Sequence, residues 1–273
     1  MTTDPTLAEM LEVRQVGNNR FEGLCGPGSP GRGFGGHTMA LGLRAGQQTV
    51  SEDRSIHALH ARFVRPVVPA EPMEFIVSPE GDSRSFSRRS VVGLQAGKER
   101  IALFLTFIEP DSKAPDFSAS MPQVPPPENL TGWFIGPIEI RSVEGQSVKT
   151  GTLPDPSRQR IWHRAANMAG ESQSLHDCAL AYLSDVTQLW LTVSVNRLSF
   201  AHKSQMLASI EHSMWFHRPT RTCEWQLYDQ FCPSTSAGTG LVQGQIYDAA
   251  GRAVATVVQN GMLRNVVPLA PGE

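Results

Sequence analysis

Hydrophobic and polar positions follow two different periods along this chain. Residues 35–50 and 174–189 carry apolar side chains at helical spacing, with Met39 and Leu43 in the first and Leu175 and Tyr182 in the second. Segments rich in Val, Ile, Phe and Trp that alternate or stay apolar are typical of antiparallel strands. These segments are residues 57–65, 73–78, 88–95, 100–108, 206–217, 224–231, 240–247 and 253–259. The pattern predicts an α+β fold in which a long helix is followed by a curled antiparallel sheet, twice.

Two groups of residues recur in the same order. F-V-R-P at residues 63–66 returns as F-H-R-P at 216–219, a spacing of 153, and A-G-K at 96–98 returns as A-G-R at 250–252, a spacing of 154. Solenoid units are ~20 to 50 residues long, so a repeat of this length indicates a duplicated domain. Interior glycines cost a helix ~1 kcal/mol each, so those in residues 35–50 imply close contact with a sheet.

A proline-rich stretch separates the two repeats. Six prolines lie between residues 109 and 130, among Asp, Ser and Lys, and they prevent regular strand pairing. We therefore expect an N-terminal domain at residues 1–109, a linker at 110–130 and a C-terminal domain at 131–273. The hairpin turns of the two domains are expected at residues 96–98 and 248–252.

Composition narrows the functional classes. The chain has 24 basic and 26 acidic residues, a net charge of -2, which gives no strong field for nucleic acid or an anionic membrane. The longest uncharged apolar run, residues 101–108, is far shorter than the ~20 residues that a membrane-spanning helix needs. The N-terminus lacks the pattern of a secretory signal, and the four cysteines form no C-x-x-C pair. We expect a cytoplasmic protein with reduced thiols, no membrane span and no nucleic-acid partner.

Several familiar catalytic patterns are absent or weak. Two G-x-G-x-x-G strings begin at Gly26 and Gly31, but prolines interrupt them and no strand–helix–strand unit surrounds them, so they predict a glycine loop before a helix. That helix start could still bind a phosphate or carbonyl oxygen through its free N–H groups. No G-x-S-x-G elbow occurs. The histidine pairs 57/60 and 212/217 are odd-spaced on strands and point to opposite faces, so no metal site is expected.

Three polar residues in the second half stand out. On a helix that continues to residue 189, Asp185 falls at the margin of the apolar stripe, where a carboxylate needs partners and is either structural or functional. Ser209 and Gln259 lie on predicted strands, and each is by itself compatible with a structural role. The repeat places the apolar Ile56 and Leu105 at the positions that match Ser209 and Gln259. Such an asymmetry is what one functional site in a duplicated chain would leave, although drift would also produce it.

The strand faces follow from simple alternation. Ser209 is expected to share a face with Glu211 and Ser213, and Gln259 with Ala255 and Val257.

These features together resemble the acyl-CoA thioesterase II family, whose members are two tandem hotdog subdomains, each a curved antiparallel sheet wrapped around a long helix. The resemblance covers most of the chain. Its specific part is H-S-M-W-F-H-R-P at 212–219 together with the Q-x-G at 259–261. The matching strings are Gly35-Gly36, F-V-R-P at 63–66, G-D-S-R-S-F-S-R-R at 81–89, Y-L-S-D at 182–185, H-S-M-W-F-H-R-P at 212–219 and V-V-Q-N-G at 257–261.

The resemblance implies an enzyme that hydrolyses acyl-CoA, in fatty acid metabolism, without a cofactor. It implies that Asp185, Ser209 and Gln259 position the hydrolytic water, with Asp185 as the general base. Donors for the oxyanion would be Gln259 or backbone N–H groups at a helix start. A homo-oligomer, dimer or tetramer, is expected because hotdog sheets extend edge to edge.

The substrate contacts are less sharply indicated. His37 stands where the family often has Gln after the two glycines. Ser209 stands where the family often has Thr, and serine keeps the hydroxyl. CoA phosphates need cations near the pocket. The candidate substrate-binding residues are Gly36, His37, Arg62, Arg65, Arg88, Arg89 and Arg218.

Two other functions stay open at this stage. A hotdog enoyl-CoA hydratase would need an acid/base pair that contains His, and Asp185 has no assigned His partner. A non-catalytic acyl-CoA binding or regulatory module would bind the ligand without turnover.

Overall fold

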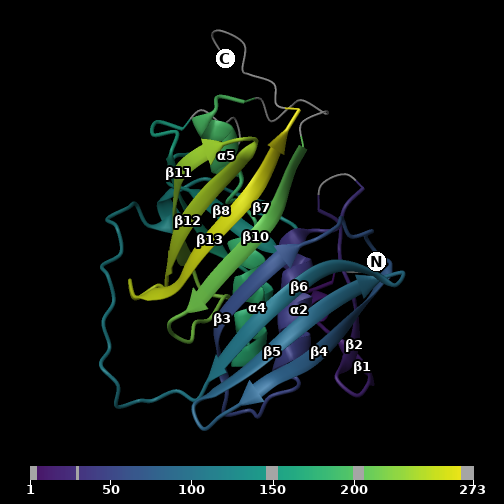
Figure 1. The fold of residues 1–273 in the computed structure, drawn as a ribbon. Helices are drawn as coiled ribbons and strands as arrows, with labels where there is room; N and C mark the ends of the chain where they lie inside the picture. The colour runs from purple at the N-terminus through teal and green to yellow at the C-terminus, as the bar shows by residue number, and fades with distance from the viewer. Residues whose placement is uncertain (1–4, 29–30, 146–152, 199–205, 266–273) are drawn as a thin grey trace.

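The two long helices lie side by side against one continuous antiparallel sheet. The computed structural model describes residues 5–28, 31–145, 153–198 and 206–265. Within them thirteen strands form a single sheet in the order β1-β2-β4-β5-β6-β3-β10-β13-β12-β11-β9-β8-β7. The sheet curls around the helices α2 (Gly35–Gln47) and α4 (Gln173–Ser184), as Figure 1 shows. Helix and sheet residues of both halves form one hydrophobic core.

The first half contributes six strands and two helices. Helix α1 (Leu7–Met10) starts with a capping box between Thr6 and Glu9. The elements that follow are β1 (Arg14–Gly17), β2 (Arg20–Leu24), α2, β3 (Ser55–Phe63), β4 (Pro72–Asp82), β5 (Phe86–Gln95) and β6 (Lys98–Ile108).

The second half repeats this order with more strands at its edge. No helix or strand forms between Ile108 and the short 3-10 helix η1 (Pro127–Asn129), and this stretch runs along the outside of the molecule in Figure 1. The elements after η1 are β7 (Gly132–Ile135), β8 (Ile138–Ser142), β9 (Arg158–Arg164), η2 (Ala166–Met168), α4, α5 (Trp190–Val195), β10 (Met206–Phe216), β11 (Gln226–Ser236), β12 (Thr239–Tyr247) and β13 (Ala253–Arg264).

The halves join where β3 pairs with β10. In this antiparallel pair His60 lies opposite Ser213, and His60 Nδ1 is 3.0 Å from Ser213 Oγ. These two positions are 153 residues apart, the spacing of the sequence repeat. A local twofold axis therefore passes between them, as expected when two copies of one domain pair through equivalent strands.

The glycines of α2 let the helix approach the sheet closely. A Cβ atom on Gly42 would lie 2.7 Å from Leu103 Cδ1, and one on Gly46 would lie 2.3 Å from Leu105 Cδ1. The contact predicted from the helix composition is therefore confirmed. α2 is the longest helix of the described residues, and none of their helices is long and apolar enough to cross a membrane.

All eight predicted strands are present, but the predicted order of elements within each half is wrong in one respect. Strands β1 and β2 precede α2, and β7, β8 and β9 precede α4, whereas a helix was expected first. The outermost of these strands, β1 and β7, are four residues long and contain no buried residue. They lack the buried alternation by which the other strands are predicted.

The second helix is shorter than predicted. Its periodicity continues to residue 189, yet α4 ends at Ser184 with Asp185 as its C-cap, and α5 begins only at Trp190. Thr187 and Gln188 are fully buried in the intervening turn, where Gln230 Nε2 donates to Thr187 Oγ1. Tertiary hydrogen bonds of this kind override the helical pattern. Because α4 ends at Ser184, the Asp185 side chain does not follow the regular helix surface.

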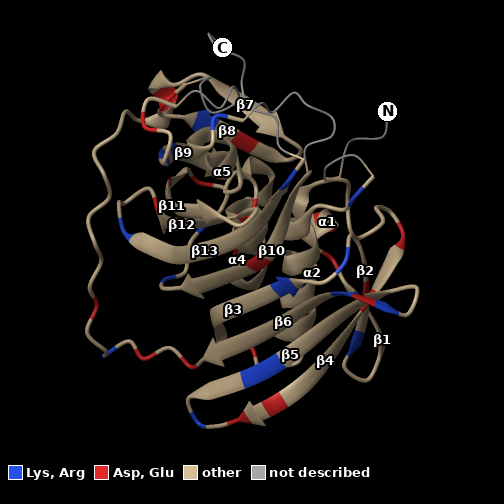
Figure 2. Ribbon diagram, turned by 45° about the horizontal axis from the view of Figure 1, so that its top comes forward, with Lys and Arg blue, Asp and Glu red and all other residues tan. Residues whose placement is uncertain are grey.

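Charge is distributed evenly. Figure 2 shows basic and acidic segments interspersed along the sheet and the connecting stretch. This agrees with the net charge of -2.

Candidate active site

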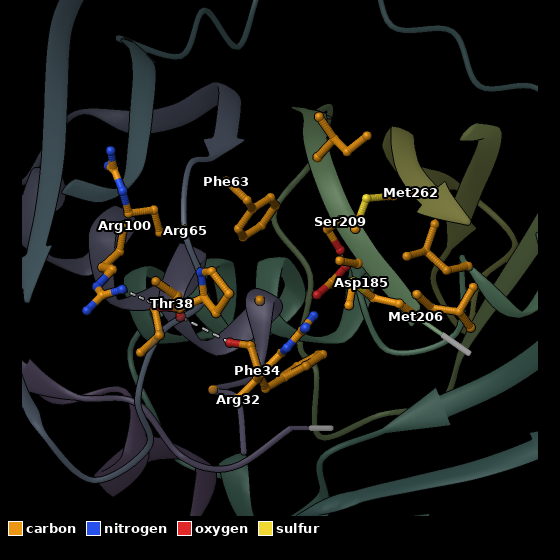
Figure 3. Close-up of a pocket in the computed structure, with 18 of the residues that line it drawn as sticks. Arg32, Phe34, Thr38, Phe63, Arg65, Arg100, Asp185, Met206, Ser209 and Met262 are labelled. Carbon is orange, nitrogen blue, oxygen red and sulfur yellow. Dashed lines mark hydrogen bonds between the residues drawn. The ribbon is translucent and has the colours of Figure 1, made fainter. Parts of the chain in front are cut away.

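A pocket opens at the junction of the two halves. Its cavity volume is about 560 Å³, and it is bounded by the start of α2, the end of β3, the turn after α4 and the first part of β10. In Figure 3 Arg65 and Arg100 lie on one side, Met206 and Met262 on the other, and Asp185 lies between them. Neither half alone contains this set of walls.

The three predicted catalytic residues meet at this pocket. Asp185 Oδ1 accepts hydrogen bonds from Ser209 Oγ at 3.1 Å and from Gln259 Nε2 at 2.6 Å. Gln259 Nε2 also donates to Ser209 Oγ at 2.7 Å. Asp185 and Ser209 line the pocket, and Gln259 lies behind them with its side chain fully buried.

A β-bulge sets the direction of Ser209. The register of β10 against β13 shifts between Ser209, which pairs with Gly261, and Glu211, which pairs with Asn260. The extra residue, Ile210, turns Ser209 to the inner face, and Glu211 stays exposed. The prediction that Ser209 shares a face with Glu211 and Ser213 is therefore wrong. Simple alternation cannot anticipate a bulge.

Strand β13 has no such irregularity at Gln259. Alternate residues Ala255, Val257 and Gln259 are buried, as predicted. Gln259 pairs with His212 of β10, so the amide reaches Asp185 from the middle of the sheet.

The start of α2 closes against Asp185 from the first half of the chain. A Cβ atom on Gly35 would lie 2.9 Å from Asp185 Oδ2, and one on Gly36 would lie 2.7 Å from the Phe34 ring and from the Tyr182 carbonyl oxygen. The backbone N–H of Gly36 bonds to the Asp185 carboxylate and favours its ionised form. The two glycines therefore permit an approach that any side chain would obstruct.

Burial changes the acidity of Asp185. Desolvation raises its pKa from 3.8 to about 6, and the hydrogen bonds from Gln259, Ser209 and Gly36 oppose this rise. Burial, together with the nearby charge of Asp185, raises the pKa of Tyr182 of α4 and of Tyr228 of β11. Arg32, Arg65 and Arg100 line the same pocket. A carboxyl with such a pKa is ionised at neutral pH yet is a stronger base than an exposed one.

Three arginines mark the polar side of the pocket, and sequence analysis named only Arg65. Arg65 Nη1 donates to the Glu99 carbonyl at 3.0 Å, and Arg100 Nη1 donates to the Pro66 carbonyl at 2.8 Å. Both partners are neutral, so neither bond cancels the charge of the guanidinium group. Arg32, which precedes α2, also lines the pocket.

The other candidate cations lie elsewhere. Arg89 is buried and pairs with Asp82, while Arg218 pairs with Asp116. Arg62 is exposed on β3 opposite Glu211, and Arg88 lies over the Phe86 ring. The structure therefore does not bring these four residues to the pocket.

His37 also points away from the pocket. It lies in α2, where its Nδ1 accepts the Gly26 N–H at 2.9 Å and its Nε2 is 2.7 Å from the Met10 carbonyl oxygen. Because a carbonyl oxygen only accepts, Nε2 carries the proton. Burial lowers the pKa of this imidazole, which therefore stays neutral. His37 ties the loop before α2 to α1.

Sequence analysis missed the two residues directly behind Gln259. His212 is fully buried, with Nδ1 3.0 Å from Gln259 Oε1 and Nε2 2.9 Å from Ser184 Oγ. Sequence analysis considered His212 as a metal ligand with His217, or as an exposed or hydrogen-bonded structural histidine, and gave it no part in the site. Its position opposite Gln259 was not visible without the strand pairing.

Comparisons with known proteins agree with this geometry. The family model "Acyl-CoA thioesterase" matches residues 136–262, and the model "Acyl-CoA thioesterase N-terminal domain" matches residues 26–108. Acyl-coenzyme A thioesterase 8 of Mus musculus is 32% identical over 85% of this chain and 80% of its own length. Acyl-CoA thioesterase 2 of Haemophilus influenzae is 27% identical over 94% of this chain and 96% of its own.

Solved structures show the same fold. The acyl-CoA thioesterase II TesB2 from Mycobacterium marinum superposes with a TM-score of 0.82 at 32% identity, covering 95% of this chain and 98% of that one. A protein from Alicyclobacillus acidocaldarius described as having a hot dog fold reaches a TM-score of 0.79 at 18% identity over 96% and 98% of the two chains, a likeness of fold alone. The chain therefore has the hotdog fold and belongs to the acyl-CoA thioesterase II family.

Proposed function

We propose that Asp185 is the general base with which this acyl-CoA thioesterase hydrolyses its substrate to a carboxylic acid and CoA. One observation carries the proposal: a buried carboxylate with a pKa of about 6 lines a pocket, held by Ser209 and Gln259 against the start of α2. The base is thus available at neutral pH and fixed in direction, as general-base catalysis requires.

The reaction needs no covalent intermediate with the protein. A water hydrogen-bonded to Ser209 Oγ and Asp185 attacks the thioester carbonyl carbon, and its proton passes to the Asp185 carboxylate. The carbonyl oxygen becomes an oxyanion, which backbone N–H groups in the first turn of α2 stabilise. The tetrahedral intermediate then collapses, the C–S bond breaks, and the CoA thiolate leaves with the proton from Asp185. Gln259 Nε2 holds both groups that contact the water.

The pocket accounts for both ends of the substrate. Its apolar wall, which includes Leu189, Trp190, Met206 and Met262, fits an acyl chain, and its basic side fits the phosphates of CoA. Arg65→Ala is expected to raise KM for acyl-CoA about tenfold with little change in kcat. An acyl-pantetheine substrate, which lacks the nucleotide phosphates, should show no such difference between the two proteins.

The geometry disfavours the hydratase alternative. Such an enzyme needs a His that reaches the substrate, but His212 faces Gln259 and Ser184, and His37 faces Gly26 and Met10. The binding-module alternative predicts binding without release of CoA.

The direct test is release of free thiol from short-, medium- and long-chain acyl-CoAs. Asp185→Asn is expected to lose at least 100-fold in kcat while staying folded. Asp177→Asn is the matched control, because Asp177 is another buried carboxyl of α4 whose pKa burial raises to about 7, and Gln173 bonds to it. Equal turnover by the native protein and Asp185→Asn would remove Asp185 from the mechanism, and binding without turnover by the native protein would indicate a binding module.

We further propose that the chain forms a homo-oligomer in the cytoplasm. Strands β1 and β7 end the sheet, and Phe134 of β7 is 71% exposed, so this edge suits pairing with another copy. Sedimentation velocity at micromolar concentration should show a dimer or tetramer, and a monomer alone would contradict the proposal.

A further inference from the structure

A closed ring of hydrogen bonds lies behind the pocket. From Asp185 Oδ1 it passes to Gln259 Nε2, from Gln259 Oε1 to His212 Nδ1, and from His212 Nε2 to Ser184 Oγ. Ser184 is the residue before Asp185, so the ring returns to its starting point along the backbone. All four residues are buried, and they come from α4 and its C-cap, from β10 and from β13.

The chemistry of the members sets the direction of each bond. An ionised carboxylate only accepts, so Gln259 must present Nε2 to Asp185 and Oε1 to His212. The amide oxygen also only accepts, so His212 must donate from Nδ1. Burial lowers the pKa of His212 to about 4, hence the ring is neutral and Nε2 carries a lone pair. The Ser184 hydroxyl has a single proton and lies between two acceptors, His212 Nε2 at 2.9 Å and the Ala181 carbonyl at 2.8 Å, so it donates to one of them at a time.

We propose that His212 is a positioning residue for thioester hydrolysis, whose Nδ1–H fixes the amide of Gln259 so that Nε2 is aimed at Asp185 and Ser209. This inference rests on the proposed role of Asp185. Without the imidazole donor, the Gln259 oxygen would be left unsatisfied in a buried site. The amide would then turn toward other partners, and its donor would leave the carboxylate.

The positioning role predicts a change in the acidity of Asp185. The hydrogen bond from Gln259 lowers the pKa of this carboxyl and opposes the effect of burial. Losing that bond raises the pKa further. The acid limb of the pH–kcat profile, which follows ionisation of the base, therefore moves to higher pH.

Two substitutions separate the effect of losing the Nδ1–H donor from the effect of changing the size of the side chain. In His212→Asn the amide nitrogen occupies the place of Nδ1 and can still donate to Gln259. In His212→Gln the amide lies farther out, near the place of Nε2, so it reaches Ser184 instead. We expect His212→Asn to keep kcat within about threefold, and His212→Gln to lose about 10- to 100-fold with KM unchanged.

The pH profile distinguishes positioning from a general structural effect. The acid limb of His212→Gln is expected about one pH unit above that of the native protein, and that of His212→Asn at the native position. His176→Gln is the control, because His176 is a fully buried histidine of α4 whose Nδ1 lies 2.9 Å from Thr222 Oγ1, away from the pocket. This control should keep both kcat and the profile.

The double variant with Gln259→Ala completes the test. His212→Gln should add no further loss of kcat to Gln259→Ala, because the imidazole acts through that amide. Additive losses, or an unshifted acid limb in a folded His212→Gln protein, would overturn the inference while leaving the function of Asp185 intact. If His212→Gln does not fold, a loss of more than tenfold in kcat with a shifted limb in His212→Asn overturns it. Undiminished turnover in Asp185→Asn would instead overturn the proposed function itself.

Discussion

Asp185 is held in a setting that favours reactivity over stability. Its pKa in the folded chain is raised to about 6, above the ordinary 3.8 that an unfolded chain shows. Well below pH 3.8 both states are protonated and the group has no effect on stability. As the pH rises toward the folded pKa, the native state keeps its proton longer than the unfolded state, so the free energy of unfolding falls. Above pH 6 the full penalty, about 3 kcal/mol, applies.

Asp185→Asn should therefore stabilise the protein while it removes activity. We expect the free energy of unfolding to rise by about 2 to 3 kcal/mol at pH 7.5, and most of the gain to be lost near pH 4, because an amide carries no such penalty. Urea unfolding at the two pH values measures this. Asp177→Asn should show a similar pH-dependent gain with activity intact, and an Asp185→Asn protein that is less stable at pH 7.5 would contradict the argument.

Gly35 carries a second residue-scale prediction. In Gly35→Ala the new methyl group would lie 2.9 Å from Asp185 Oδ2 and 3.2 Å from Phe63 Cε1, so the carboxylate must shift. A displacement of ~1 Å in a catalytic group costs about 100-fold in rate, and we expect that loss in kcat. Stopped-flow or steady-state thiol release checks it, and circular dichroism should show an unchanged fold.

Individual residues of the site were predictable to different degrees. Asp185, Ser209 and Gln259 stood out because the other repeat has apolar residues at the last two matching positions and because the family motifs cover them. Their catalytic roles stay predictions. His212 escaped notice because its function depends on strand pairing across the bulge at Ile210, and pairing register is not written in one strand alone.

At the scale of elements, α2 is specified by its packing more than by its propensity. Replacing Gly46 by Ala would gain about 1 kcal/mol of helix propensity, but the new Cβ would meet Leu105 Cδ1 at 2.3 Å. Overpacking of this kind costs about 1–3 kcal/mol, so we expect Gly46→Ala to be destabilising overall.

A compensating change tests this explanation. Leu105→Val shortens the opposing side chain, so the double variant with Gly46→Ala should recover most of the lost stability in thermal unfolding, beyond the sum of the two single effects. Strict additivity would show that contact with Leu105 is not the cause. Because Gly46 lies near the far end of α2 from Asp185, kcat should stay native in every variant.

The elements that sequence analysis predicted are those with long buried faces. Eight strands and both long helices show clear periodicity, and their bounds differ from the observed ones by a few residues. The short edge strands and the break after Ser184 depend on contacts with distant residues such as Gln230. Such contacts become visible only in the folded chain.

At the scale of the whole molecule, the β3–β10 pairing and the packing of α2 on α4 join the halves. After Lys113 the stretch is held to the second half, by hydrogen bonds from Arg218 to Asp116 and the Phe117 carbonyl and by the packing of Met121 and Val124. A specific protease site inserted after Lys113 should therefore be cut without loss of turnover, and the two fragments should co-elute in gel filtration. Separation of the fragments would show that covalent linkage, not the shared sheet, keeps the halves together.

The position of the pocket between the halves has a consequence for the evolution of the chain. Asp185, Ser209 and Gln259 come from the second half, and the helix start that closes on them comes from the first. Under the proposed mechanism, neither half can be lost, or recombined alone into another gene, without loss of the activity. Selection therefore acts on the pair as one unit, and the matching positions of the first half, Ile56 and Leu105, are free to serve the core instead of the chemistry.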